Sequence, residues 1–127
     1  MRYLVTIGPF AAFFTNVNTE MKLAGHSHFA QVTLHFQHQG RGFPAFENTY
    51  RAVQDHIKDT TSAPFRNMTN EQVALGLYLA FREWTAPEIE AWAGDALNLV
   101  RLDLDVRGVP DKIGHADAFT RYTVEGP

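Results

Sequence analysis

Residues 26–38 read HSHFAQVTLHFQH, and this run predicts a β-strand. One parity carries His28, Ala30, Val32, Leu34 and Phe36, and the other carries Ser27, Phe29, Gln31, Thr33 and His35. Alternation with a period of two, in residues that are often β-branched or aromatic, is typical of a strand. The glycine-containing run at residues 39–42 ends it.

Three other segments also predict strands, at residues 3–14, 99–107 and 118–125. Gly8-Pro9 interrupts the first of them, and we expect a bulge or bend at that point. In the second, four apolar residues alternate with Arg101, Asp103, Asp105 and Arg107, which is the pattern of an amphipathic strand.

Two helices are predicted between the second and third strands, at residues 47–58 and 70–84, because their apolar residues recur at spacings of three and four. Thr69 precedes the second helix and Gln72 follows three residues later, so we expect a capping box. A short third helix is expected at residues 87–93, where a proline suits the first turn.

The order of these elements is strand, strand, helix, helix, strand, strand. Grouped strands and grouped helices favour an α+β fold with an antiparallel sheet and both helices on one face. We expect one domain over residues 1–127. A four-stranded sheet leaves open edges, so we also expect the chain to form a homo-oligomer.

The composition excludes several classes of function. The net charge is −3 with both signs scattered along the 127 residues, so no basic surface is expected and the composition argues against a nucleic-acid partner. Cysteine is absent, so disulfides, thiolate metal ligands and a cysteine nucleophile are excluded. No apolar run approaches the roughly 18 residues of a membrane span. We expect no membrane partner and a cytoplasmic location.

His26 and His28 form the first candidate site. Alternate side chains of a strand share a face, so both imidazoles could bind one metal ion. The alternative is a pair of surface or hydrogen-bonded histidines. His35 lies on the opposite parity and should not join them.

Three further groups could carry chemistry. Asp55-His56 could supply a carboxylate that orients a general base, or simply a solvated helix face. Glu71, beside Thr69 at a helix N-terminus, could accept two parallel N–H bonds from an amidine-like ring edge, or merely favour the helix dipole. Asp103 and Asp105 could be solvated, or could hold a ligand inside the tunnel of a closed barrel.

The middle third of the chain resembles the 6-pyruvoyl- and 6-carboxy-tetrahydropterin synthases of the tunnelling (T-fold) superfamily. His26-Ser27-His28 matches the family's zinc-binding histidine pair. Gln54-Asp55-His56 matches its Leu-Asp-His element, and Asn67-Met68-Thr69-Asn70-Glu71 matches its Asn-Pro-Thr-x-Glu run. Two positions differ, since Phe14 stands where the family has the third zinc histidine and Lys22 stands where it has the catalytic cysteine.

The resemblance implies a T-fold whose subunits join into a β-barrel, with ligands at subunit interfaces. It implies a lyase acting on the side chain of a dihydropterin by acid–base chemistry. Glu71 with Thr69, or Asp103 and Asp105, would bind the pterin. Lys22, Asp55 and His56 would move protons, and His26 with His28 would hold zinc if a third ligand completed the site.

Other interpretations stay open. Dihydroneopterin aldolases and epimerases are a second T-fold family that needs neither metal nor cysteine. A non-catalytic T-fold protein could bind a pterin-like ligand or act as an oligomeric scaffold. An unrelated two-layer α+β fold is a further alternative.

Overall fold

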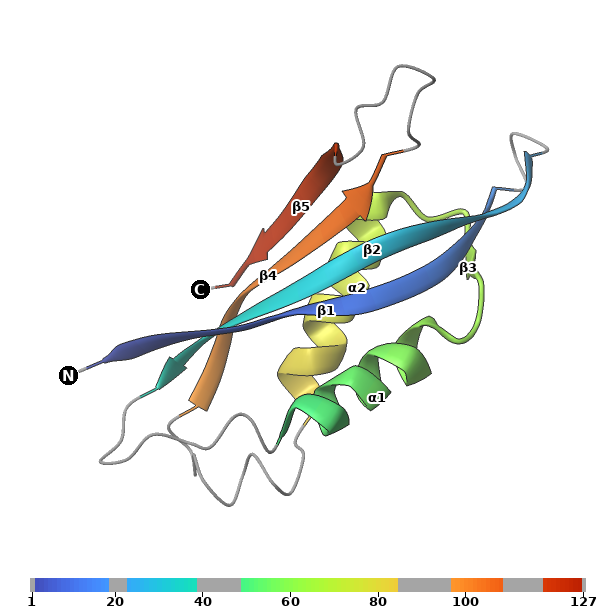
Figure 1. Ribbon diagram of the computed structural model, residues 1–127. Helices are drawn as coiled ribbons and strands as arrows, with labels where there is room; N and C mark the ends of the chain where they lie inside the picture. Colours follow the sequence, from blue (N-terminus) through green and yellow to red (C-terminus); the bar gives the residue numbers. More distant parts are fainter. Residues whose placement is uncertain (1, 19–22, 39–48, 85–96, 109–117, 127) are drawn as a thin grey trace.

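A computed structural model describes residues 2–18, 23–38, 49–84, 97–108 and 118–126. It has the α+β architecture expected from the sequence, with a curled sheet and two helices (Figure 1). The elements are β1 (Tyr3–Asn18), β2 (Leu23–His38), α1 (Tyr50–Thr61), β3 (Phe65–Arg66), α2 (Asn70–Glu83), β4 (Leu97–Arg107) and β5 (Phe119–Glu125). Neither helix within the described ranges is long and apolar enough to cross a membrane.

The sheet has the order β3-β1-β2-β4-β5. The four long strands pair antiparallel in sequence order, whereas β3 lies parallel to the end of β1. The expectation of a purely antiparallel sheet was therefore wrong in one respect, because β3 makes the sheet mixed. A strand of two residues is too short to show alternation of apolar and polar residues, so β3 could not be predicted from the sequence.

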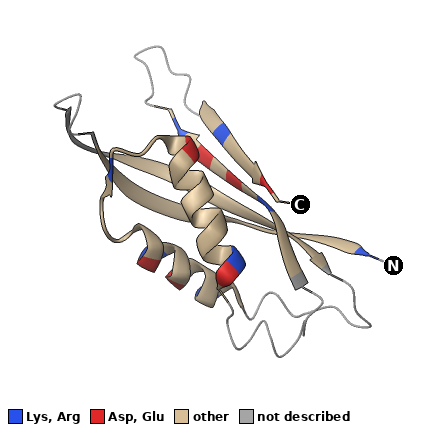
Figure 2. Cartoon of the chain, turned by 180° about the vertical axis from the view of Figure 1, so that it is seen from behind, with Lys and Arg blue, Asp and Glu red and all other residues tan. Residues whose placement is uncertain are grey.

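Both helices cover the same face of the sheet, which Figures 1 and 2 show from opposite sides. Helix α1 packs against β1, and α2 packs against β4 and β5. The first helix lies three residues further along the chain than expected. The predicted capping box of α2 is confirmed, since Thr69 Oγ1 accepts from the Gln72 amide and Gln72 Oε1 accepts from the Thr69 amide. The short helix expected at 87–93 lies outside the described residues.

The expected irregularity at Gly8-Pro9 is confirmed as a bulge in β1. The register shifts between Ile7 and Phe10, so three steps along β1 match two steps along β2. Gly8 has φ = 128°, and a Cβ there would lie 2.9 Å from the carbonyl oxygen of Val32. Because of the bulge, odd-numbered residues of β1 face the helices before Gly8 and even-numbered residues face them after Pro9.

The hydrophobic core lies between the sheet and the helices. Its fully buried side chains come from β1, β2 and β4 and from one stripe of each helix. They include Phe14, Val32, Leu34, Leu102, Leu104, Val53, Ile57, Val73 and Leu77. The opposite face of the sheet has no helix over it among the described elements, and we call it the open face.

Candidate functional site

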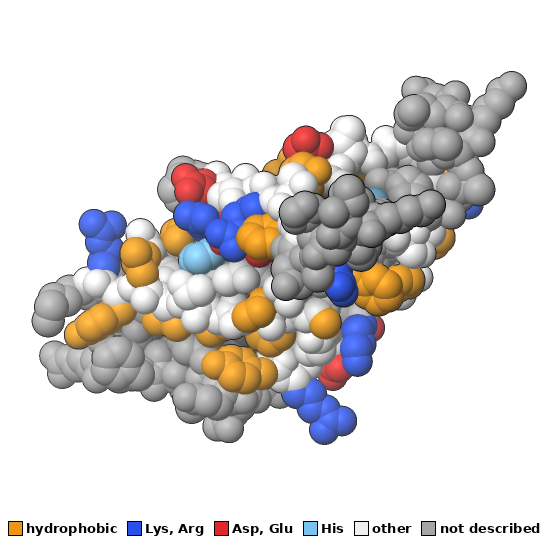
Figure 3. All heavy atoms as spheres, turned by 45° about the horizontal axis from the view of Figure 1, so that its top comes forward, with side chains coloured by type: hydrophobic (Ala, Val, Ile, Leu, Met, Phe, Trp, Pro, Cys, Tyr) orange, Lys and Arg blue, Asp and Glu red, His pale blue; other side chains and the backbone are white. Residues whose placement is uncertain are grey.

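The open face carries most of the polar chemistry of the sheet. In Figure 3, basic, acidic and histidine side chains gather there beside separate exposed hydrophobic side chains. Asp103 and Asp105 of β4 lie on this face, yet only 2% and 9% of their surfaces are exposed. Buried carboxylates need hydrogen-bonding partners, and the neighbouring strands supply them.

Asp103 accepts hydrogen bonds from three side chains. Arg101 Nε and Thr123 Oγ1 donate to Oδ1 at 3.0 and 2.7 Å. His35 Nε2 lies 2.8 Å from Oδ2. Burial alone would raise the pKa of Asp103, but the hydrogen bonds from Thr123, His35 and Arg101, together with the charge of Arg101, leave this pKa below its ordinary value.

His35 extends this network to β1. An ionised carboxylate only accepts hydrogen bonds, so His35 Nε2 must carry the proton that it shares with Asp103. In the neutral ring, Nδ1 is then an acceptor, and it lies 3.0 Å from Thr6 Oγ1. One chain of hydrogen bonds thus crosses β1, β2, β4 and β5. An imidazole held at one nitrogen by a buried carboxylate is an arrangement that can transfer protons.

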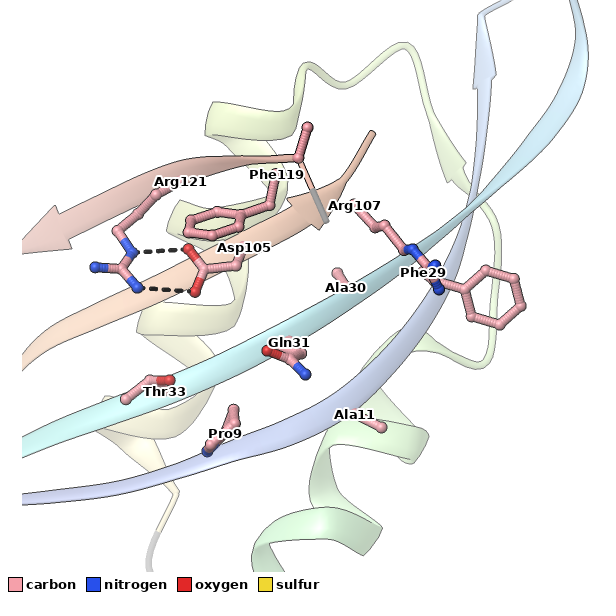
Figure 4. Close-up of a pocket in the computed structure, with 11 residues that line it drawn as sticks. Pro9, Ala11, Phe29, Ala30, Gln31, Thr33, Asp105, Arg107, Phe119 and Arg121 are labelled. Atoms are coloured by element: carbon pink, nitrogen blue, oxygen red, sulfur yellow. Dashed lines mark hydrogen bonds and ion pairs between the residues drawn. The ribbon is translucent and has the colours of Figure 1, made fainter. Parts of the chain in front are cut away.

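Asp105 forms a two-pronged ion pair with Arg121 of β5. Arg121 Nε and Nη2 donate to the two carboxylate oxygens at 2.7 and 3.0 Å (Figure 4). These bonds, and the charge of Asp105, raise the pKa of Arg121 above its ordinary value. The Phe119 ring lies 5.7 Å from the guanidinium carbon, within the range of a cation–π contact.

A hollow with a volume of about 650 Å³ opens on this face next to the ion pair. Residues of all four long strands or their ends line it: Pro9, Ala11, Phe29, Ala30, Gln31, Thr33, Asp105, Arg107, Ala118, Phe119 and Arg121. Figure 4 shows Phe119 beside the Asp105–Arg121 pair, Gln31 and Thr33 on β2, and Phe29 at the far end of the labelled group. Exposed aromatic rings beside charged and amide groups suit a flat, polar ring system.

The expected zinc site is not assembled by the described side chains. His28 lies on the helix-covered face against the ring of Phe14, at 5.2 Å between centroids. Phe14 is completely buried, so it fills the position of the third ligand with a phenyl ring. His26 pairs with Asn16 in the strand register, but its side chain is outside the description. Within the described ranges no three residues of suitable type come together to hold a metal. Zinc therefore stays a prediction.

The start of α2 lies at the same end of the sheet as His28. Asn16, two residues beyond Phe14 on the same strand, donates from Nδ2 to the carbonyl of Met68 at 2.8 Å. Thr69 follows directly, with its hydroxyl engaged in the helix cap. Glu71 is exposed in the first turn of α2. The structure thus gathers His28, Thr69 and Glu71 at this end of the molecule, on the helix-covered side.

Asp55 and His56 lie elsewhere. His56 stacks on Trp84 at 4.6 Å between centroids and meets the edge of Phe81, at the C-terminal end of α2, while Asp55 is exposed. The rise of an α-helix puts Trp84 about 20 Å from Glu71. Within one chain, therefore, Asp55 and His56 do not share a site with Glu71. Lys22 lies outside the described residues.

The sequence interpretation missed His35, Thr6, Arg121 and Thr123. A usable signal was present, because the parity of β2 that contains Gln31, Thr33 and His35 is almost wholly polar, and the same holds for one parity of 99–107 and of 118–125. Three polar parities on neighbouring strands must share one face. The identity of the facing partners could not be obtained without the register.

We found no match of this chain to a protein-family model, to a curated protein or to a solved structure.

Proposed function

We propose that this chain is a T-fold-like subunit of a homo-oligomer that binds a pterin-like heterocycle and acts on its side chain by acid–base chemistry. The observation that carries the proposal is the hollow of the open face, where the Asp105–Arg121 pair lies beside the exposed ring of Phe119. The resemblance of the middle third of the sequence to pterin synthases supplies the class of ligand.

The oligomer is supported by the edges of the sheet. β5 is the last strand on one side, and on the other side β3 covers β1 only at Asn16 and Val17. Open edges pair readily with other strands. If β5 of one copy pairs with β1 of the next, the sheet continues toward a barrel with the open face inside. The buried carboxylates and the exposed Phe13, Phe29 and Phe119 would then line its interior.

The chemistry of the hollow supports binding of the ring. A planar heterocycle can stack on Phe29 or Phe119. A carboxylate has about four lone-pair positions, and Arg121 uses two of those on Asp105, so an aminopyrimidine edge could still donate to it. Glu71 is a second anchor in this proposal and would come from a neighbouring subunit, because within one chain it lies on the other side of the sheet from the hollow.

The burial of Phe14 favours a metal-free mechanism, as in the aldolases and epimerases, over a zinc-dependent one. It equally favours a second candidate function, a non-catalytic subunit that only binds the heterocycle. Lys22 remains the proposed base in the aldolase-like alternative.

Titration of the protein with 6-methylpterin, followed by pterin fluorescence, tests the proposal. We expect saturable quenching that weakens at least about tenfold in Asp105→Asn, because one charge-assisted hydrogen bond contributes about 1.5–3 kcal/mol. Asp59→Asn, an exposed change on α1, is the matched control and should bind like the wild type. Light scattering should give a mass of several subunits.

The outcomes separate the alternatives. Absence of saturable quenching by 6-methylpterin would contradict the proposed ligand. Binding without turnover of dihydroneopterin would favour the non-catalytic subunit. Stoichiometric zinc in the purified protein would argue against the metal-free mechanism.

A further inference from the structure

We infer that His35 is the proton-transfer group of the open face, and that its Nδ1 receives the proton of a hydroxyl group on the ligand's side chain. The inference rests on the proposed function for the identity of the ligand. It adds a residue that the sequence motifs did not indicate.

The tautomer of His35 is fixed from one side. Asp103 is almost fully buried and is held as a carboxylate by Arg101 and Thr123, so it can only accept the hydrogen of His35 Nε2. The basic lone pair of the neutral ring is thereby placed on Nδ1. Asp103 acts here as a positioning residue, because it orients the ring and stabilises the imidazolium that forms when Nδ1 takes up a proton.

The other side of the ring faces a hydroxyl group. With Nδ1 as acceptor, Thr6 Oγ1 must donate to it across 3.0 Å. Thr6 is exposed, and 22% of the His35 side chain is accessible, so a ligand can approach this contact from solvent. The threonine hydroxyl occupies the position that a hydroxyl group of a bound ligand would take.

The hollow lies within reach of His35. Thr33 lines the hollow, and His35 follows it by two residues on the same face of β2, which is about 7 Å along a strand. Pro9 lines the hollow on β1, and Thr6 lies beyond the bulge on the same strand. A flat ring in the hollow that bears a short hydroxyalkyl chain would therefore bring its hydroxyl to Nδ1.

The proposed step is a proton transfer. The O–H bond of the ligand breaks, its electron pair stays on the ligand oxygen, and a new N–H bond forms at His35 Nδ1. The positive charge of the imidazolium is balanced by the carboxylate of Asp103. Return of the proton restores both groups.

The tautomer provides a test that needs no ligand. In ¹⁵N NMR spectra of the full chain at about pH 9, where histidines are ordinarily neutral, we expect Nε2 of His35 to carry the proton and Nδ1 to be bare. In Asp103→Asn the facing amide can donate, so the preference should reverse. A proton on Nδ1 in the wild type would overturn the inference.

A pair of ligands tests the transfer itself. We expect 6-hydroxymethylpterin to bind about tenfold more tightly than 6-methylpterin, and His35→Gln to remove this difference. Glutamine can still donate an amide hydrogen to Asp103, so the fold should persist, but it has no basic nitrogen at the position of Nδ1. Thr6→Ala removes the competing hydroxyl and should strengthen binding of the hydroxymethyl compound alone.

The possible results are distinct. Equal binding of the two pterins by the wild type would overturn the role of His35, whatever His35→Gln does, and would leave the proposed function intact. Loss of both ligands only in His35→Gln would indicate a structural role and overturn the inference. If the wild type binds neither pterin, the proposed function fails, and with it the ligand assigned to His35.

Discussion

The helix-covered face and the open face of the sheet are both buried in part, but by different physical means. On the helix-covered face, apolar side chains such as Phe14 and Leu104 are shielded from water by the two helices. The stabilisation depends on the apolar area buried and not on the direction of individual contacts. On the open face, hydrogen bonds from donors on a neighbouring strand replace the water around Asp103 and Asp105. Each donor must lie within hydrogen-bonding distance of a carboxylate oxygen.

The two faces therefore differ in how strictly they constrain the sequence. An apolar face tolerates many sequences of similar volume, whereas a buried carboxylate requires specific partners. The open face therefore holds Asp103, Asp105 and His35 in defined orientations. Four substitutions test this comparison, from the largest expected effect to the smallest.

Phe14→Ala should lower the free energy of unfolding by about 4 kcal/mol, because it removes a completely buried aromatic ring and leaves a cavity. Chemical denaturation measures the effect. Phe13→Ala is the matched control, since Phe13 is the next residue and lies 51% exposed on the open face. Similar losses in the two variants would mean that the open face is buried as thoroughly as the core, as in a tightly closed oligomer.

Asp103→Asn should cost about 2 kcal/mol at neutral pH, because three donors lose a charged acceptor. The cost should also depend on pH. The pKa of Asp103 is lower in the folded protein than its ordinary value near 3.8, so its contribution is complete above that value and is lost as pH falls through the folded-state pKa.

Unfolding curves of the wild type and of Asp103→Asn, taken from about pH 6 downward, check this expectation. The two free energies should converge below about pH 4. Asp59→Asn, on the exposed surface of α1, should show no such convergence. A constant difference at every pH would contradict the assigned charge state.

Thr69→Ala should cost about 1 kcal/mol, because it removes the side-chain acceptor of the α2 cap. The loss acts through the helix that covers the apolar face. Thr69→Ser keeps the hydroxyl and should retain most of the stability. An equal loss in both variants would indicate that the methyl group, and not the cap, is responsible.

Thr6→Ala should change stability by less than about 0.5 kcal/mol, since Thr6 is an exposed end of the hydrogen-bond chain. Thermal unfolding measures the effect. Thr123→Ala is the informative comparison, because its hydroxyl donates to the buried Asp103 at the other end of the chain and its loss should cost more. The reverse order would show that the network depends on β1 more than on β5.

Local features of the structure were readily predicted. The alternation at 26–38 and 99–107 gave two strands, and the Thr69–Gln72 spacing gave the helix cap, because each signal lies within a few neighbouring residues. The spacing of apolar residues predicted both helices but placed α1 three residues too early. β3 was missed because its pairing with β1 is a tertiary contact.

The candidate site was predicted only in part. Asp103 and Asp105 were identified as candidate ligand-binding residues from their charge on an alternating strand. Their partners were not, because His35 lies 68 positions from Asp103 and meets it only through the pairing of β2 with β4. His56 stacks on Trp84, and this contact could not be predicted from a helical spacing.

The sequence by itself determined that this protein has an α+β fold, where its long strands run, and that one parity of several strands is polar. Those properties follow from the geometry of the backbone and from side chains close along the chain. Only the tertiary structure decided that the polar parities form one open face, and that Asp103 holds His35 there with Nδ1 turned to Thr6. The reason is the register, because cross-strand partners are set by pairings between distant segments, which no local pattern encodes.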